Sequence, residues 1–454
     1  CAAIMAGTLA VAGLLLTPIG GASAQDFGKG AILHDTEIDN TLRAYARPIL
    51  EAGGIPPDSI SIHMIVDDSL NAFVTPGNHM FFHTGLLLKT KSSSEVLGVM
   101  AHEIGHIAGG HAVTTNDGMA KASTISMLAL LLGVAAGVAS GNPDAGIAVL
   151  MGGQQVALGQ MLSFSRSVES SADQFALRTL EQTGQSAEGL YDFFGLLAGQ
   201  EMLISASQDP YMRTHPLTRD RMATIRAAID RSAYSDVPPK PEFEREHRRM
   251  VAKLFAFLKP QITTLQRYPE SDTSIEARYA RTIAYYRRGQ FDKSLPLVEG
   301  LLKDEPEDPY FWQIKGDMLL SKSDIDGAVV AYRKSLEYLP DAPEILIAMA
   351  HAMTQRPNAA YAEEAQAALR RALTIDRENP GAWDMLARSY AYDDNLGMSA
   401  YAAAERAILL GQFQEVRRYT MEAEKYVERD TPTWHRLQDI KIAAENYKED
   451  MKRR

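Results

Sequence analysis

Residues 101–106 read Ala101-His102-Glu103-Ile104-Gly105-His106, an HExxH motif inside an apolar run that predicts an α-helix. In a helix, residues four apart lie one turn apart on the same face, so both imidazoles can reach a single metal ion. Glu103 lies beside them as a candidate general base. The motif therefore predicts a zinc site with its own base, on a helix whose start is predicted by the capping box Ser92-x-x-Glu95.

A third zinc ligand must come from elsewhere, because a catalytic site uses three protein ligands and keeps one position open. The sequence offers three candidates, His111, Glu169 and His215. His111 is disfavoured, because on a continued helix it would point about 180° away from His102. Glu169 is favoured, because on a separate predicted helix Asp173 follows it by one turn, where it could accept the second imidazole proton of a ligand histidine.

The charge of the chain narrows the class of partner. Its 454 residues carry a formal net charge of −11. A nucleic-acid-binding protein needs a basic surface to neutralise phosphates, so this balance argues against nucleic acid. A protein or peptide partner is the better expectation.

The N-terminal residues predict export. An apolar stretch over 4–16, followed by Ala22-Ser23-Ala24, is typical of a secretory signal peptide, here assigned to residues 1–24. Cys1 is the single cysteine and would leave with that segment, whereas a lipid-bearing Cys1 is the alternative. After cleavage no cysteine would remain, which excludes disulfides and a thiol nucleophile.

Residues 122–165 form the most apolar part of the chain, with Asp144 as their one charged residue. The first part, 122–139, would be about 27 Å long as a helix, which is just enough to span a bilayer. A helical hairpin, buried or resting on a membrane surface, fits equally well. The hairpin is favoured because the segment separates two halves of one metal site, although a spanning pair would also return the chain to the same side.

The C-terminal part is repetitive. The residues that recur at the characteristic places of a 34-residue tetratricopeptide unit include Trp312, Gly316, Leu319, Ala328, Tyr332 and Pro340. We expect at least four helix pairs and a terminal helix starting near Trp434. Such pairs stack into a solenoid whose concave face usually binds a peptide or protein, although it could also merely pack on the rest of the chain.

These patterns predict a mainly α chain. A zincin-like α+β metallopeptidase domain is expected over 25–235, with strands at 60–66 and 79–83. A linker and connecting helix follow over 236–270, and an α-solenoid of tetratricopeptide repeats occupies 271–454.

Four ordered motifs resemble those of the HtpX and CAAX-prenyl-endopeptidase clan of gluzincin metallopeptidases. They are Asn71-Ala72-Phe73 with Pro76-Gly77, the HExxH motif, Glu169-x-x-x-Asp173 and His215-Pro216. One departure is Gly77-Asn78, where the clan often has two glycines. The resemblance implies that His102, His106 and Glu169 bind one zinc ion per chain, with Glu103 as the general base.

The resemblance also implies how substrate is held. The residues Asn71, Ala72, Phe73 and Val74 resemble an edge strand beside the cleft, which would pair with the backbone of an extended polypeptide. His215 resembles the clan's active-site loop histidine. We expect His215 to stabilise the oxyanion during catalysis, or to occupy the open zinc position in a resting state.

Two functions follow as expectations. The first is a zinc endopeptidase of the periplasm that degrades misassembled or stalled envelope and outer-membrane proteins, with its repeats docking on the outer-membrane protein assembly machinery. The second is a chaperone or assembly scaffold for outer-membrane proteins with gated or minor proteolysis. Contact with a membrane surface would come from residues 122–165.

Overall fold

The computed structural model describes residues 29–111, 165–198, 210–355 and 359–453. The chain divides into two compact units, Phe27–Phe255 and Ala256–Arg454. The predicted signal peptide and nearly all of the predicted apolar hairpin lie outside the described residues. Among the helices that are described, none is both long and apolar enough to cross a bilayer.

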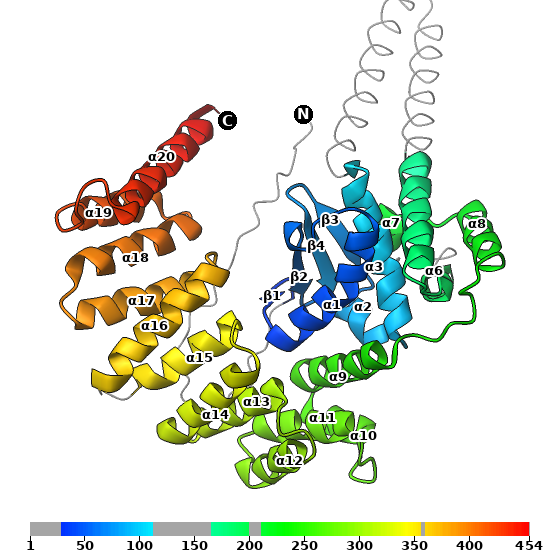
Figure 1. Ribbon diagram of the computed structural model, residues 1–454, viewed down its shortest axis with the longest axis horizontal. Helices are drawn as coiled ribbons and strands as arrows, with labels where there is room; N and C mark the ends of the chain where they lie inside the picture. Colours follow the sequence, from blue (N-terminus) through cyan, green and yellow to red (C-terminus); the bar gives the residue numbers. More distant parts are fainter. Residues whose placement is uncertain (1–28, 112–164, 199–209, 356–358, 454) are drawn as a thin grey trace, which may run out of the picture. The chain divides into compact units, whose positions relative to one another are not determined.

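The first unit packs helices against a small sheet (Figure 1). Its elements are β1 Ile32–Leu33, α1 Thr36–Ala52, a 3-10 turn Pro57–Ser59, β2 Ser61–Ile65, β3 Ala72–Thr75, β4 His79–His83, α2 Thr84–Lys89, α3 Ser93–Ala108, a helix over 165–182, α6 Glu188–Ala198, α7 Pro210–Thr214, α8 Arg219–Ile229 and α9 Pro241–Leu258. The strand predicted over 79–83 is β4, and the one predicted over 60–66 is β2, one residue shorter at each end.

The sheet has the order β1-β2-β4-β3. β2 and β4 run parallel, whereas β1 and β3 each pair antiparallel with their neighbour. Met64, Met80 and Phe82 are completely buried, which shows that alternate residues of β2 and β4 form the core side of the sheet. β3 is thus an edge strand of the described sheet, and it contacts α3.

Two glycines let other helices approach α3 closely. A Cβ atom on Gly98 would lie 2.6 Å from the backbone nitrogen of Leu190, and one on Gly105 would lie 2.8 Å from the carbonyl oxygen of Ala172. Any larger residue would push α6 or the 165–182 helix away. The absence of side chains at these two places therefore brings the helix that carries Glu169 against the HExxH motif.

The start of α3 differs from the predicted capping box. Ser92 is the N-cap residue, but its hydroxyl bonds to that of Ser94, and Glu95 accepts a hydrogen bond from the backbone of Lys91. The backbone N–H of Ser93, which has no partner within the helix, instead donates to the Glu244 carboxylate at 2.7 Å. Glu244 of α9, about 150 positions away in sequence, therefore caps the N-terminus of α3 in place of the predicted local capping box.

α9 is held to the first unit by buried charge. Arg249 lies 2.8 Å from one oxygen of Glu37, and the Lys253 amine lies 3.1 Å from the other. Lys253 also reaches Asp35 at 2.8 Å. The predicted domain limits at residues 235 and 270 remain predictions, while the division between the two compact units falls inside α9.

The second unit consists of helices. They are α10 Gln261–Arg267, α11 Ile275–Tyr286, α12 Phe291–Asp304, α13 Pro309–Ser321, α14 Ile325–Tyr338, α15 Pro343–Thr354, α16 Ala359–Ile375, α17 Pro380–Tyr392, α18 Leu396–Leu409, α19 Phe413–Ala423 and α20 Pro432–Arg453. Sequence neighbours pack as antiparallel pairs from α11 with α12 to α19 with α20. The predicted repeats are confirmed, and the terminal helix starts near Trp434 as predicted.

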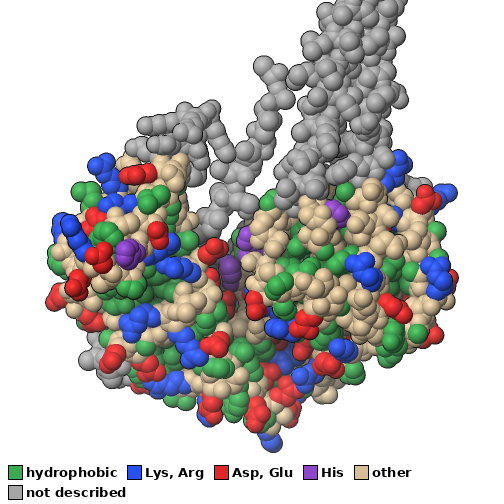
Figure 2. All heavy atoms as spheres, turned by 45° about the horizontal axis from the view of Figure 1, so that its top comes forward, with side chains coloured by type: hydrophobic (Ala, Val, Ile, Leu, Met, Phe, Trp, Pro, Cys, Tyr) green, Lys and Arg blue, Asp and Glu red, His purple; other side chains and the backbone are tan. Residues whose placement is uncertain are grey.

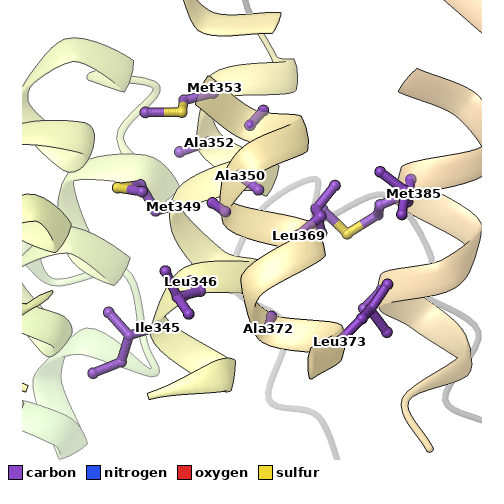
Figure 3. Close-up of a cluster of buried hydrophobic side chains, with 14 of the residues drawn as sticks. Ile345, Leu346, Met349, Ala350, Ala352, Met353, Leu369, Ala372, Leu373 and Met385 are labelled. Atoms are coloured by element: carbon purple, nitrogen blue, oxygen red, sulfur yellow. The ribbon is translucent and has the colours of Figure 1, made fainter. Parts of the chain in front are cut away.

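The repeat residues pack as the pattern requires. A Cβ atom on Gly316 would lie 2.6 Å from the ring of Tyr332, so glycine at this place lets the tyrosine lie against α13. Further along, small and flexible residues fill the space between helices (Figure 3). Met349, Ala350 and Leu369 lie in one continuous buried cluster with Met385, which joins α15, α16 and α17.

Charged side chains of both signs are interspersed over the visible face of each unit (Figure 2). Many form local exposed pairs, such as Arg333 with Glu364 and Arg371 with Asp341, the latter at 2.7 Å. Pairs of this kind contribute little to stability because water screens them. On the face that Figure 2 shows, charges of both signs are thus interspersed.

Candidate metal centre

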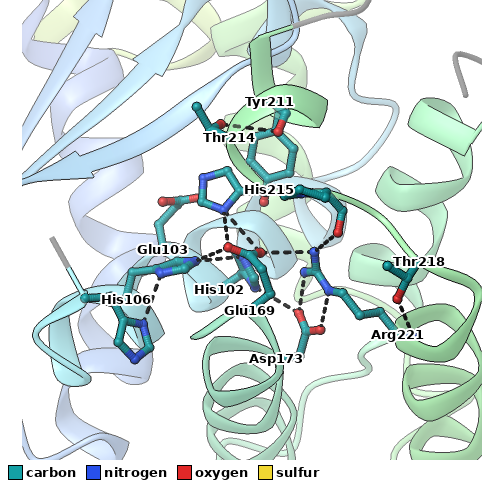
Figure 4. A network of polar contacts seen from close by, with 12 residues as sticks. His102, Glu103, His106, Glu169, Asp173, Tyr211, Thr214, His215, Thr218 and Arg221 are labelled. Carbon is teal, nitrogen blue, oxygen red and sulfur yellow. Dashed lines mark hydrogen bonds and ion pairs between the residues drawn. The ribbon is translucent and has the colours of Figure 1, made fainter. Parts of the chain in front are cut away.

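Four side chains meet at one buried point of the first unit. One donor atom from each of His102, His106, Glu169 and His215 lies within 4.8 Å of the other three. The two histidines of the motif come from α3, Glu169 from the 165–182 helix, and His215 from the residue that follows α7. Figure 4 shows the Glu169 carboxylate facing the imidazoles.

The contacts of Glu169 define the centre. Nε2 of His102 lies 3.3 Å from Oε2, whereas Nε2 of His106 lies 3.5 Å from Oε1. Nδ1 of His215 lies 3.1 Å from Oε1. The Nε2 atoms of His102 and His106 are 3.1 Å apart, so both rings turn the same nitrogen toward this carboxylate.

Asp173 lies on the other side of the His102 ring. Its Oδ1 is 2.9 Å from Nδ1 of His102, the nitrogen that does not face Glu169. Burial alone would lower the pKa of His102, but hydrogen bonds with Asp173 and Glu169 raise it to about 9. Asp173 therefore stands where the sequence placed it, as a partner that fixes the ring of a candidate ligand.

His111 also belongs to this network, which the argument from a continued helix did not foresee. α3 ends at Ala108, and Gly110 adopts a positive φ of 62°, so the chain turns back after the helix. Nδ1 of His111 consequently lies 3.1 Å from Nδ1 of His106. The premise of a continued helix was wrong, and His111 contacts the outer nitrogen of a candidate ligand.

Glu103 is completely buried, and its carboxylate lies near His215. Within the described residues its carboxylate oxygens make no hydrogen bond of ordinary geometry, and Oε1 is 3.6 Å from Nε2 of His215. Burial raises the pKa of Glu103, while His215 and His102 oppose that shift. A buried, unsatisfied carboxylate is costly to keep, which favours a chemical role over a structural one.

The electrostatics of two candidate ligands, His106 and Glu169, suit a cation. Burial lowers the pKa of His106 well below its ordinary value, and the neighbouring His102 adds to this effect, so His106 is neutral. Burial would raise the pKa of Glu169, but hydrogen bonds with His102 and His215 hold it well below the usual range. A neutral imidazole and an ionised carboxylate are the forms that bind metal.

Two further residues that sequence reasoning missed line the centre. Arg221, in the first turn of α8, contacts both Asp173 and Glu169. Tyr211, on α7, stacks its ring on that of His215 with centroids 4.6 Å apart. Neither residue type forms a recognisable spacing with the HExxH motif, so no signal in the sequence singled them out.

The predicted edge strand also lies beside the centre. β3 contains Ala72, Phe73 and Val74, and Asn71 directly precedes it. The backbone nitrogen of Tyr211 lies 3.4 Å from the carbonyl oxygen of Leu70, which joins the segment before His215 to the start of this strand. The structure thus brings every predicted site residue into one region, while their chemical roles stay predictions.

The donor set fits a metal ion such as zinc. Two imidazole nitrogens and a carboxylate converge in a buried place, and each imidazole has an outer partner that fixes its ring. Zinc in catalytic sites takes this combination of ligands. The separate buried carboxylate of Glu103 supplies a base, so the fold and the centre together define a metallopeptidase of the HExxH class.

Comparison with known families agrees with this class. Residues 35–229 match the model described as Peptidase family M48, so this part of the chain is a peptidase domain of that type. The resemblance seen in the ordered motifs is confirmed, and the match supports a metalloendopeptidase activity for this domain.

The chain is also similar to whole proteins. It is 21% identical to the beta-barrel assembly-enhancing protease of Escherichia coli K12 over 392 residues, 86% of this chain and 79% of the relative. A Vibrio cholerae relative is 28% identical over 297 residues, which span 63% of this chain and 60% of the relative. The solved structure of yeast Tom70 aligns with 63% of this chain at 16% identity and a TM-score of 0.34, too slight a likeness to support an inference.

Proposed function

We propose that the chain is a zinc-dependent endopeptidase whose single zinc ion is held by His102, His106 and Glu169. The observation that carries this proposal is the convergence of these donors beside the buried carboxylate of Glu103. Zinc bound there would supply Lewis acidity, which polarises a peptide carbonyl and lowers the pKa of a water molecule.

Glu103 acts as the general base. It takes a proton from the attacking water and later delivers it to the leaving amine. Its burial serves both steps, because a carboxylate with a raised pKa holds the proton until the amine departs. Asp173 and His111 hold the rings of His102 and His106 in the orientation that directs Nε2 to the centre.

His215 has two possible places, and both follow from its position between Glu103 and Glu169. During reaction it stabilises the negative charge that develops on the carbonyl oxygen. In a resting state it adds a fourth donor to the centre. A His215→Ala variant with unchanged turnover and unchanged zinc affinity would remove it from the site.

The substrate is an extended polypeptide. Within the described residues β3 pairs with another strand on one side only, so a substrate segment can add to the sheet through its own backbone. Backbone pairing reads little sequence, and we expect loose specificity. Unfolded or stalled proteins expose the extended segments that such a site requires.

The cellular role we propose is quality control of envelope and outer-membrane proteins in the periplasm. The name of the Escherichia coli relative and the repeat unit support it. The repeats would dock on the outer-membrane protein assembly machinery. Cell fractionation tests the location directly, since the chain should be recovered with periplasmic contents.

The decisive test of chemistry is Glu103→Gln in the full chain. We expect cleavage of an unfolded protein such as casein to fall about 100- to 10,000-fold, because the base is lost. Zinc content should stay at one ion per chain. Glu95→Gln, on the same helix and away from the centre, is the matched control and should retain full turnover.

The same variant separates enzyme from scaffold. Cells that carry Glu103→Gln in place of the wild-type chain should accumulate unassembled outer-membrane proteins. Full envelope integrity in those cells would instead favour the chaperone or scaffold function, in which proteolysis is gated or minor.

A further inference from the structure

Arg221 contacts the centre without offering a metal-binding atom. Its side chain is buried, and its guanidinium donates to both oxygens of Asp173, from Nε at 2.7 Å and from Nη2 at 2.8 Å. This is the two-point geometry in which a planar guanidinium matches a carboxylate. A lysine amine could not reproduce it.

The remaining nitrogen of Arg221 joins two other parts of the centre. Nη1 lies 3.0 Å from Oε2 of Glu169 and donates to the carbonyl oxygen of Pro216 at 2.9 Å. The ring of Phe194 lies against the guanidinium, with 4.9 Å from its central carbon to the ring centroid. One buried side chain thus connects the 165–182 helix with the loop that carries His215.

This contact distinguishes the two oxygens of Glu169. Oε2 lies 3.0 Å from Arg221 and 3.3 Å from Nε2 of His102, whereas Oε1 faces His106 and His215. A carboxylate with one oxygen in a charge-assisted contact to a guanidinium is restrained in its rotation. The arrangement therefore restrains the orientation of the Glu169 carboxylate at the centre.

We propose that Arg221 is a positioning residue, which restrains the orientation of the Glu169 carboxylate and holds the His215 loop at the metal centre. The inference rests on the proposed zinc function and deepens it. Partners in the outer shell of a metal site commonly govern affinity by 10- to 100-fold, and Arg221 touches a ligand, a ligand's partner and the loop at once.

The experiment uses the full chain with Arg221→Lys and Arg221→Met. Zinc is removed with a chelator, and affinity for zinc alone is measured by competition with a chromophoric chelator. We expect zinc to bind about 10- to 100-fold more weakly to both variants. The absorption spectrum of the cobalt-substituted chain should also change, because the ligand geometry around the ion is altered.

Arg226 provides the matched control. It lies on the same helix, α8, and pairs with Glu188 and Asp230 at the surface. Arg226→Lys and Arg226→Met should leave zinc affinity and the cobalt spectrum unchanged. They report any general effect of replacing an arginine of α8.

The outcomes separate a positioning role from a structural one. A lower melting temperature with unchanged zinc affinity and cobalt spectrum would overturn the inference. If Arg221→Met does not fold, Arg221→Lys decides the matter, since it keeps the charge and loses the two-point geometry. A wild-type chain that binds no zinc would overturn the proposed function as well, whereas normal wild-type binding with unaffected Arg221 variants would overturn this inference alone.

Discussion

The two units of this chain are stabilised in different ways. The peptidase unit buries charged groups, among them Glu37, Arg249 and Lys253, and satisfies them with partners more than 200 residues away. The core of the repeat unit is mainly Ala, Leu and Met, supplied by helices adjacent in sequence. Local repetition allows the helices of the second unit to be predicted from sequence. The first unit depends on contacts between distant residues, which no local sequence pattern predicts.

The largest effect should follow from breaking the buried charge cluster. Glu37→Gln leaves the cations of Arg249 and Lys253 with less negative charge nearby. We expect the free energy of unfolding of the peptidase unit to fall by about 3–5 kcal/mol. Calorimetry of the full chain would measure this loss as a lower melting temperature for the unfolding transition of the peptidase unit.

An exposed ion pair of the repeat unit provides the contrast with this buried charge cluster. Arg371→Ala removes the partner of Asp341, and both side chains are more than half exposed. Its expected cost is below about 1 kcal/mol. Equal losses for the two substitutions would contradict the difference drawn between the units.

The next effect concerns pH and zinc. The pKa of about 9 means that His102 carries a proton at neutral pH when no metal is bound. A zinc ligand must be neutral, so binding releases that proton and affinity rises as the pH rises toward 9. Between pH 6 and 8 the apparent affinity should increase about 100-fold, or about 2.7 kcal/mol.

Chelator competition at three pH values would measure this slope. Asp173→Asn should flatten it, because the hydrogen bond that raises the pKa of His102 is weakened. An affinity that does not vary between pH 6 and 8 would show that His102 is already neutral in the metal-free chain.

A smaller effect is expected from glycine in the repeats. Gly316→Ala puts a methyl group 2.6 Å from the buried ring of Tyr332, whose hydroxyl is tied to Asp317 at 2.7 Å. The ring cannot swing away freely, so we expect a loss of about 1–3 kcal/mol from the repeat unit. Urea unfolding followed by helical circular dichroism would detect it.

The smallest effect has the opposite sign. At Gly300, on α12, the nearest atom to an added methyl group would be Nη1 of Arg278 at 3.9 Å, an ordinary contact. Gly300→Ala should therefore stabilise the repeat unit by up to about 1 kcal/mol through helix propensity. A loss comparable with that of Gly316→Ala would mean that space around the glycine is not the deciding factor.

The sequence allowed the fold class and the motif residues to be predicted because both rest on short spacings. The i, i+4 pairs of His102 with His106 and of Glu169 with Asp173 needed only helix geometry. The role of Arg221 could not be predicted, because three arginines lie within eight residues of α8. Only the folded chain shows which of them points toward the centre. His111 could have been found, since a glycine pair after a helix is a known signal for its end.

The bond between Ser93 and Glu244 has a consequence for synthesis of the chain. A ribosome releases the HExxH motif, Glu169 and His215 before it releases α9, yet the helix that carries the motif is capped by a residue of α9. The emerging peptidase therefore has its chemical groups before it has its final fold. The N-terminal cap of α3 can therefore form only after α9 has been synthesised.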